Sequence, residues 1–137
     1  MTHLGALNLG IDMCNALSAA RRAGWIYVDL KPSNIFISEN KEYRIGDLGF
    51  VAMDPLAYAS LPDRYRSIYT ALEVADAYSS LNATMDTYAL GLVLYQIYNE
   101  GKLPFEPENR QAWLDALAAG EPVAAPSCAD PEMAEII

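Results

Sequence analysis

The sequence predicts a mainly α-helical domain of the α+β class with one short β-hairpin. Three patterns indicate this: a helical repeat of apolar residues near the N-terminus, a strongly apolar run at Ala89–Ile97, and two short β-rich runs between residues 35 and 45. With 137 residues, 53% of them hydrophobic, the chain can bury one core. We therefore expect residues 1–137 to form one domain or part of one.

The first predicted helix ends near Ala23, and Gly24 is its stop signal. Its apolar residues recur at steps of three or four, which places them on one face that we expect to be buried. This stripe consists of Leu4, Leu7, Ile11, Cys14, Leu17 and Ala20.

The predicted hairpin follows soon after this helix. Its strands are Ile35–Ile37 and Tyr43–Ile45, joined by the polar turn Glu39–Glu42. From Gly46 to Glu73 the chain has no steady period, so we expect a long functional loop there.

A second long helix should begin at Thr84 or Asp86 and run through Tyr98. It is apolar on most of its circumference, which is typical of a helix buried at the centre of a domain. A shorter amphipathic helix at Arg110–Ala119 and a Pro-rich connector, Pro122–Pro131, complete the chain, and a further helix begins near its end.

Charge and composition exclude several classes of function. A formal charge of −9 disfavours the basic surface that nucleic acid requires, so we expect no nucleic-acid partner. Cys14 and Cys128 lack metal-ligand spacing and should be reduced thiols. The most apolar run is far shorter than the roughly 20 residues that span a bilayer, and no secretory charge pattern precedes Arg21. We expect a cytoplasmic protein without a membrane segment.

The most informative stretch is Tyr27–Asn34, in which Asp29, Lys31 and Asn34 share one short loop. It resembles the catalytic loop of the eukaryotic-type serine/threonine protein kinases. The resemblance implies that Asp29 accepts the proton of the substrate hydroxyl and that Lys31 neutralises charge on the transferred phosphoryl group. It also implies that Asn34 holds a magnesium ion.

Further motifs follow in the order of that family. Asp47-Leu48-Gly49 matches the Asp-Phe-Gly motif of the family. The resemblance therefore implies that Asp47 binds Mg²⁺ together with Asn34. Lys31 is expected to bind the ATP phosphates beside these two residues. Ala71-Leu72-Glu73 stands where the family has Ala-Pro-Glu. Asp86 matches the aspartate that anchors the backbone of the catalytic loop.

The resemblance covers essentially the whole chain, but only the larger, C-terminal lobe of a kinase domain. No segment of the sequence matches the smaller lobe or the last helices of the larger one. The expected reaction is transfer of the γ-phosphoryl group of Mg-ATP to a serine or threonine of a protein substrate. Because the smaller lobe provides most of the grip on the nucleotide, we expect these 137 residues alone to be inactive, and to self-associate through exposed core surface.

The sequence departs from the family at a few positions. Val28 replaces the arginine that pairs with a phosphate on the activation segment, and Tyr27 replaces the preceding histidine. Arg66 stands where the family has a threonine that bridges the catalytic aspartate and lysine, so Ser67 must take over this role or substrate positioning is impaired.

Three alternatives remain open. The chain could be a pseudokinase or non-catalytic protein-binding module, a small-molecule phosphotransferase, or a fragment with no independent role. Taken singly, Asp29 and Asp47 also fit ordinary turns, and Asp86 fits a helix N-cap. The intact Asp29, Asn34 and Asp47 favour an enzyme.

Overall fold

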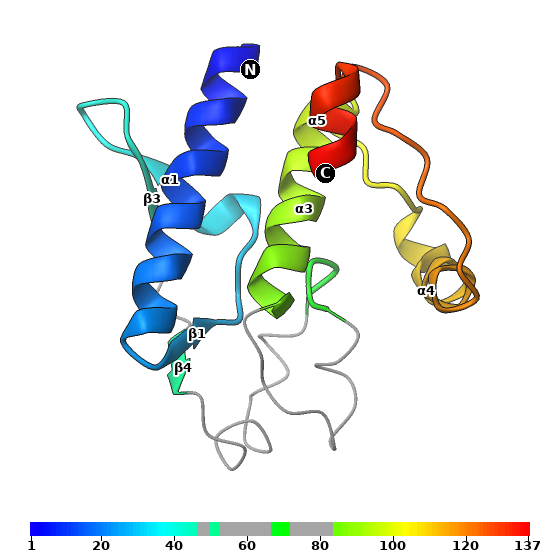
Figure 1. Cartoon of the computed structure of the whole chain (residues 1–137), viewed down its shortest axis with the longest axis horizontal. Helices are drawn as coiled ribbons and strands as arrows, with labels where there is room; N and C mark the ends of the chain where they lie inside the picture. Colours follow the sequence, from blue (N-terminus) through cyan, green and yellow to red (C-terminus); the bar gives the residue numbers. More distant parts are fainter. Residues whose placement is uncertain (47–49, 53–66, 72–83) are drawn as a thin grey trace. The chain divides into compact units, whose positions relative to one another are not determined.

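The computed structural model of the chain describes residues 1–46, 50–52, 67–71 and 84–137. The chain divides into two compact units, Met1–Leu90 and Gly91–Ile137. Figure 1 labels their main elements. The first unit contains the helix α1 (His3–Arg22), the strands β1 (Trp25–Tyr27), β2 (Ile35–Ile37), β3 (Tyr43–Ile45) and β4 (Phe50–Ala52), and a 3-10 turn at Pro32–Asn34. The helix α3 (Thr84–Tyr98) begins in this unit and ends in the second.

Helix α1 ends as the sequence predicts, and its start is capped by Thr2. The Thr2 hydroxyl accepts a hydrogen bond from the backbone N–H of Gly5 at 3.1 Å, which caps the first turn. Arg21 and Arg22 lie in the last turn, where positive charge is favourable. Gly24 follows with φ +82°, a left-handed conformation that residues other than glycine rarely adopt.

The buried face of α1 differs from the predicted one. Leu4 and Ile11 are 66% and 58% exposed, and Cys14 is also exposed. The buried side chains are Ala6, Leu9 and Met13. The prediction of the buried stripe was therefore wrong. The face of α1 that is buried is the one that packs against the strands β1 and β3, and the apolar spacing within the helix does not reveal which face that is.

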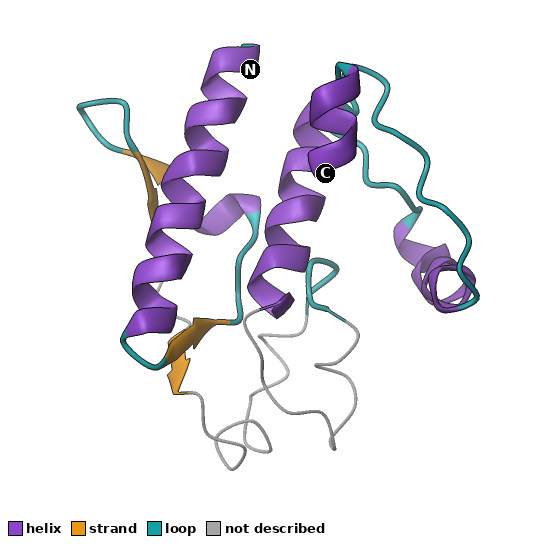
Figure 2. Ribbon diagram, in the orientation of Figure 1, coloured by secondary structure: helices purple, strands orange, loops and turns teal. Residues whose placement is uncertain are grey.

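The predicted hairpin is confirmed. Strands β2 and β3 are antiparallel, with Ile35 opposite Ile45 and Ile37 opposite Tyr43. In the turn, Lys41 has φ +62°. Figure 2 shows a second antiparallel pair, β1 and β4, in which Trp25 lies opposite Ala52; the sequence did not predict it.

Helix α3 is buried on most sides, as its composition predicts. Its buried side chains are Met85, Asp86, Ala89, Leu90, Leu92, Val93, Leu94, Tyr95 and Tyr98. Despite this apolar composition, the described helices include none with the length and hydropathy needed to cross a membrane.

The second unit contains α4 (Arg110–Ala118) and α5 (Pro131–Ile136) after the end of α3. Both elements agree with the prediction. The rings of Phe105 and Trp113 lie 4.6 Å apart between centroids and connect the turn after α3 to α4. The Asp130 side chain accepts from the backbone N–H of Met133 at 2.9 Å and caps α5.

Candidate active site

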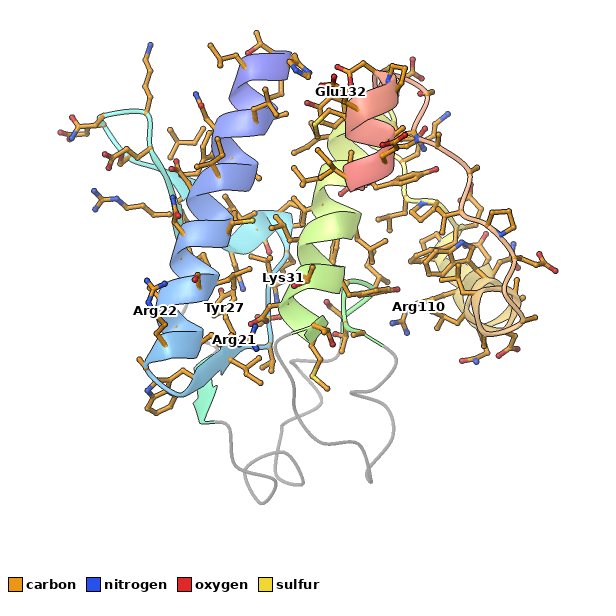
Figure 3. All side chains as sticks on the ribbon, viewed as in Figure 1. Arg21, Arg22, Tyr27, Lys31, Arg110 and Glu132 are labelled. Atoms are coloured by element: carbon orange, nitrogen blue, oxygen red, sulfur yellow. The ribbon has the colours of Figure 1, made fainter. Side chains whose placement is uncertain are left out.

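The loop that carries the candidate catalytic residues connects β1 to β2 and is folded back on itself. The backbone N–H of Asn34 donates to the carbonyl of Lys31 at 2.9 Å and closes the 3-10 turn, which Pro32 begins. The turn returns Asn34 towards Asp29, and each of these two residues is only 5% exposed. Figure 3 labels Lys31 on this loop, near the start of α3.

Asp29 and Lys31 form a two-pronged ion pair. The Lys31 Nζ lies 2.9 Å from Asp29 Oδ1 and 2.8 Å from Asp29 Oδ2. The side chain of Asp29 is 6% exposed and that of Lys31 is 26% exposed, so the lysine is much more accessible to solvent than the carboxylate. A buried carboxylate without such a partner would be strongly destabilising.

The side-chain amide of Asn34 donates two hydrogen bonds to Asp29. Nδ2 donates to the Asp29 backbone carbonyl and to Oδ2, each at 2.9 Å. Because both partners are oxygens, the NH₂ group must face Asp29. The Asn34 Oδ1 atom is therefore directed away from Asp29, and among the described residues no hydrogen bond engages it, so it could serve as an oxygen ligand.

Asp86 anchors the residue where the loop begins. Its Oδ2 accepts from the backbone N–H of Tyr27 at 2.9 Å, and among the described residues its buried Oδ1 has no hydrogen-bond partner. Burial raises the pKa of Asp86 from 3.8 to about 7, while the hydrogen bond from Tyr27 opposes this rise. Asp86 lies inside α3, so it is not an N-cap.

Tyr27 connects the loop to the end of the hairpin. Its ring is fully buried, and its hydroxyl donates to the Gly46 carbonyl at 2.6 Å. The N–H of Gly46 donates to the Asn34 carbonyl at 2.8 Å. Gly46 is thus held through both of its backbone polar groups, directly before Asp47 in the sequence.

Several predicted residues cannot be placed. Asp47, Arg66, Leu72 and Glu73 lie outside the described residues. Asp29, Lys31 and Asn34 are brought together as the resemblance implies, and their roles in chemistry remain predictions.

Ser67 lies in the short described segment 67–71. Its Oγ accepts from the backbone N–H of Tyr69 at 3.2 Å and lies 3.5 Å from Thr70 Oγ1. These contacts stay within its own loop, so among the described residues the Ser67 hydroxyl does not bridge Asp29 and Lys31. Val28, at the position of the family arginine, is buried.

The donor chemistry fits magnesium. An amide oxygen at Asn34 and a carboxylate at Asp47 are hard ligands of the kind that Mg²⁺ takes, with waters and phosphate oxygens completing its shell. Among the described residues no group of three or more His, Cys, Asp or Glu side chains forms an all-protein metal site. Two protein ligands completed by waters or phosphate oxygens suit this donor set better than an all-protein structural site.

Sequence reasoning missed two contacts that position the site. One is the hydroxyl of Tyr27 on Gly46, which is not readable from a motif. The other is Asp12, whose Oδ2 accepts from the backbone N–H of Tyr43 at 2.8 Å. Asp12 could have been noticed, because it is the only acidic residue in α1.

Comparisons with known proteins match most of this chain to one family. Residues 6–127 match the family model described as the protein kinase domain. The serine/threonine-protein kinase PknB of Mycobacterium tuberculosis is 32% identical over 112 residues, which cover 80% of this chain and 18% of that protein.

Two other relatives show a similar extent of matching. Serine/threonine-protein kinase Pkn1 of Myxococcus xanthus is 34% identical over 116 residues, covering 77% of this chain and 16% of Pkn1. The human tyrosine-protein kinase TXK is 23% identical over 111 residues, covering 80% of this chain and 21% of TXK. The chain thus spans 16% to 21% of the length of these three relatives.

Proposed function

The chain belongs to the protein kinase domain family, and from this we propose that it carries the phosphoryl-transfer loop of a serine/threonine protein kinase. The proposed reaction moves the γ-phosphoryl group of ATP, with Mg²⁺, to a hydroxyl of a protein substrate. Residues 1–137 would form part of the larger, C-terminal lobe of the kinase domain. Two reduced cysteines suit the cytoplasmic location that is part of this proposal.

The hydrogen bonds of Asp29 support its role as the base. A carboxylate oxygen accepts about two hydrogen bonds. Oδ2 already accepts from Lys31 and Asn34, whereas Oδ1 accepts only from Lys31 among the described residues. We assign the remaining site on Oδ1 to the substrate hydroxyl, whose proton Asp29 accepts during transfer.

Lys31 and Asn34 complete the proposed chemistry. Lys31 holds the Asp29 carboxylate in place and, being partly exposed, can also approach an incoming phosphoryl group. Asn34 Oδ1 would hold the metal ion together with Asp47. When bound, Mg²⁺ neutralises the charge that develops on the phosphate oxygens.

The preference for serine or threonine has two supports. Lys31-Pro32-Ser33-Asn34 is the serine/threonine form of the loop, and the names of PknB and Pkn1 give that specificity to those relatives. The match to TXK makes tyrosine the alternative acceptor that must be tested.

The observation that carries the proposal is the arrangement of Lys31 and Asn34 around the buried carboxylate of Asp29. The test is phosphate transfer from radiolabelled ATP by the natural gene product, followed by identification of the phosphorylated amino acid. We expect phosphoserine and phosphothreonine, and a loss of roughly 10²–10⁴-fold in rate with Asp29→Asn. Undiminished transfer by Asp29→Asn would contradict the assigned base.

We also propose that the 137 residues by themselves do not turn over. Orientation of two substrates supplies about 7–11 kcal/mol of a barrier reduction. By the resemblance, most of the grip on the nucleotide comes from the smaller lobe, which these 137 residues do not match. Sustained turnover by this chain, abolished by Asp29→Ala, would overturn that part of the proposal.

A further inference from the structure

Asp12 contacts the hairpin that leads to Asp47. It is half-buried on α1, and its Oδ2 accepts from the backbone N–H of Tyr43, the first residue of β3, at 2.8 Å. Figure 1 shows β3 lying beside α1. No other residue of α1 is acidic, so the contact does not arise from a generally acidic helix face.

The pairing of the hairpin explains why this N–H needs a partner outside the hairpin. The backbone N–H of Ser38 donates to the Glu42 carbonyl at 2.9 Å, so Ser38 and Glu42 form a hydrogen-bonded pair. In an antiparallel ladder such pairs alternate with pairs whose N–H groups turn outward, and the next pair is Ile37 with Tyr43. The N–H of Tyr43 therefore points out of the hairpin, where Asp12 accepts it through a charge-assisted bond.

The other end of β3 is also held. Gly46 follows the strand, donates to the Asn34 carbonyl at 2.8 Å and accepts from the Tyr27 hydroxyl at 2.6 Å. Only Arg44 and Ile45 separate Tyr43 from Gly46. A shift of β3 at Tyr43 would therefore be transmitted to Gly46, which precedes Asp47 in the sequence.

We propose that Asp12 is a positioning residue for the proposed metal site: by fixing the start of β3 against α1, it holds Gly46, the residue before the proposed ligand Asp47, in its hydrogen bond to Asn34. This inference rests on the proposed function, in which Asp47 and Asn34 share a magnesium ion. Asp12 itself does not touch metal or substrate. It acts through the backbone of β3, as outer-shell partners of metal ligands do.

The test is a titration of the 137-residue chain with Mn²⁺, with free Mn²⁺ followed by electron paramagnetic resonance. We expect Asp12→Ala to weaken Mn²⁺ binding roughly tenfold. Asp12→Asn retains an oxygen that can accept from Tyr43, so it should bind within about threefold of the wild type. Asn15→Ala, an exposed polar residue of the same helix, is the matched control.

A purely structural role for Asp12 would give a different pattern. Alanine has a higher helix propensity than aspartate, so α1 itself should not weaken in Asp12→Ala. Unchanged Mn²⁺ affinity in Asp12→Ala, or a loss in Asp12→Asn as large as in Asp12→Ala, would overturn the proposal.

Hydrogen exchange separates this inference from the proposed function. In the metal-free chain, Asp12→Ala should speed exchange at the Gly46 amide several-fold, and Asp12→Asn should restore it. If the wild type binds no Mn²⁺, the proposed function fails. The exchange rate of the Gly46 amide then tests separately whether Asp12 holds β3 in place. An unchanged rate in Asp12→Ala would overturn that role of Asp12.

Discussion

Asp86 accepts a hydrogen bond from the backbone N–H of Tyr27 at 2.9 Å, although 59 positions separate the two residues in the chain. This contact fixes the start of the catalytic loop to the first turns of α3. Burial of the Asp86 carboxyl group, which outweighs this hydrogen bond, raises the pKa of Asp86 to about 7.

The first prediction concerns pH. The folded chain holds the Asp86 proton more tightly than the unfolded chain does, where the pKa is 3.8. The stability that this proton provides is complete below about pH 4 and is lost as the pH rises through 7. Relative to Asp86→Asn, the free energy of unfolding of the wild type should fall by roughly 4 kcal/mol over this range.

Urea denaturation at intervals from pH 4 to pH 8 measures this difference. Asp115→Asn, which changes an exposed acid on α4, is the control and should follow the wild type. If the free energies of unfolding of the wild type and Asp86→Asn changed in parallel with pH, the raised pKa of the buried Asp86 carboxyl would be contradicted.

The second prediction concerns the hydroxyl of Tyr27. Tyr27→Phe keeps the buried ring but leaves the Gly46 carbonyl without its donor, which should cost about 1–3 kcal/mol of stability. Tyr43→Phe is the matched control, because Tyr43 lies on β3, the strand that leads to Gly46, and its hydroxyl makes no hydrogen bond among the described residues. Thermal unfolding measures both, and equal shifts in Tm would show that the Tyr27 hydroxyl is not needed.

The third prediction concerns Asn34. Asn34→Ala removes two donors from the buried Asp29. We expect a loss of about 1–3 kcal/mol in the free energy of unfolding. Asn40→Ala, at an exposed position in the hairpin turn, should change it little. Chemical denaturation checks this, and an unaltered midpoint for Asn34→Ala would argue against the two bonds.

Self-association is the fourth prediction. Leu4 and Ile11 are seven residues apart on α1, and therefore share one face on which both are more than half exposed. Replacing both with lysine should lower the mass measured by light scattering at high protein concentration. The same double change at the exposed Asn8 and Asn15 adds equal charge and should not. A wild type that stays monomeric at every concentration would refute this prediction.

The sequence predicted those elements whose signals are local. Thr84–Tyr98 is buried on most sides because its apolar composition leaves no broad polar face, and the strands of the hairpin are β-rich runs around a polar turn. The pairing of Trp25–Tyr27 with Phe50–Ala52 was missed, since it joins two three-residue segments that are distant in the chain. The buried face of α1 was misjudged because its partners, β1 and β3, come later in the sequence.

The candidate site was predicted through its motif spacing. Asp29, Lys31 and Asn34 were singled out by the resemblance of their segment to the kinase catalytic loop, and they converge because the turn at Pro32 reverses a very short segment. The contributions of Asp12 and Tyr27 could not be predicted, since each acts through a backbone group of another element. Hydrogen bonds from side chains to remote backbone leave no periodic signal in a sequence.

The central claim is that Asn34 and Asp47, the residue after Gly46, hold a divalent cation beside Asp29. Nuclear magnetic resonance of the 137-residue chain during addition of Mn²⁺ tests it most directly, because the ion broadens signals only from nuclei close to it. We predict selective broadening of the Asn34 side-chain amide and the Gly46 backbone amide. Broadening confined to exposed acids such as Glu39 and Glu42, with Asn34 and Gly46 unaffected, would contradict the account.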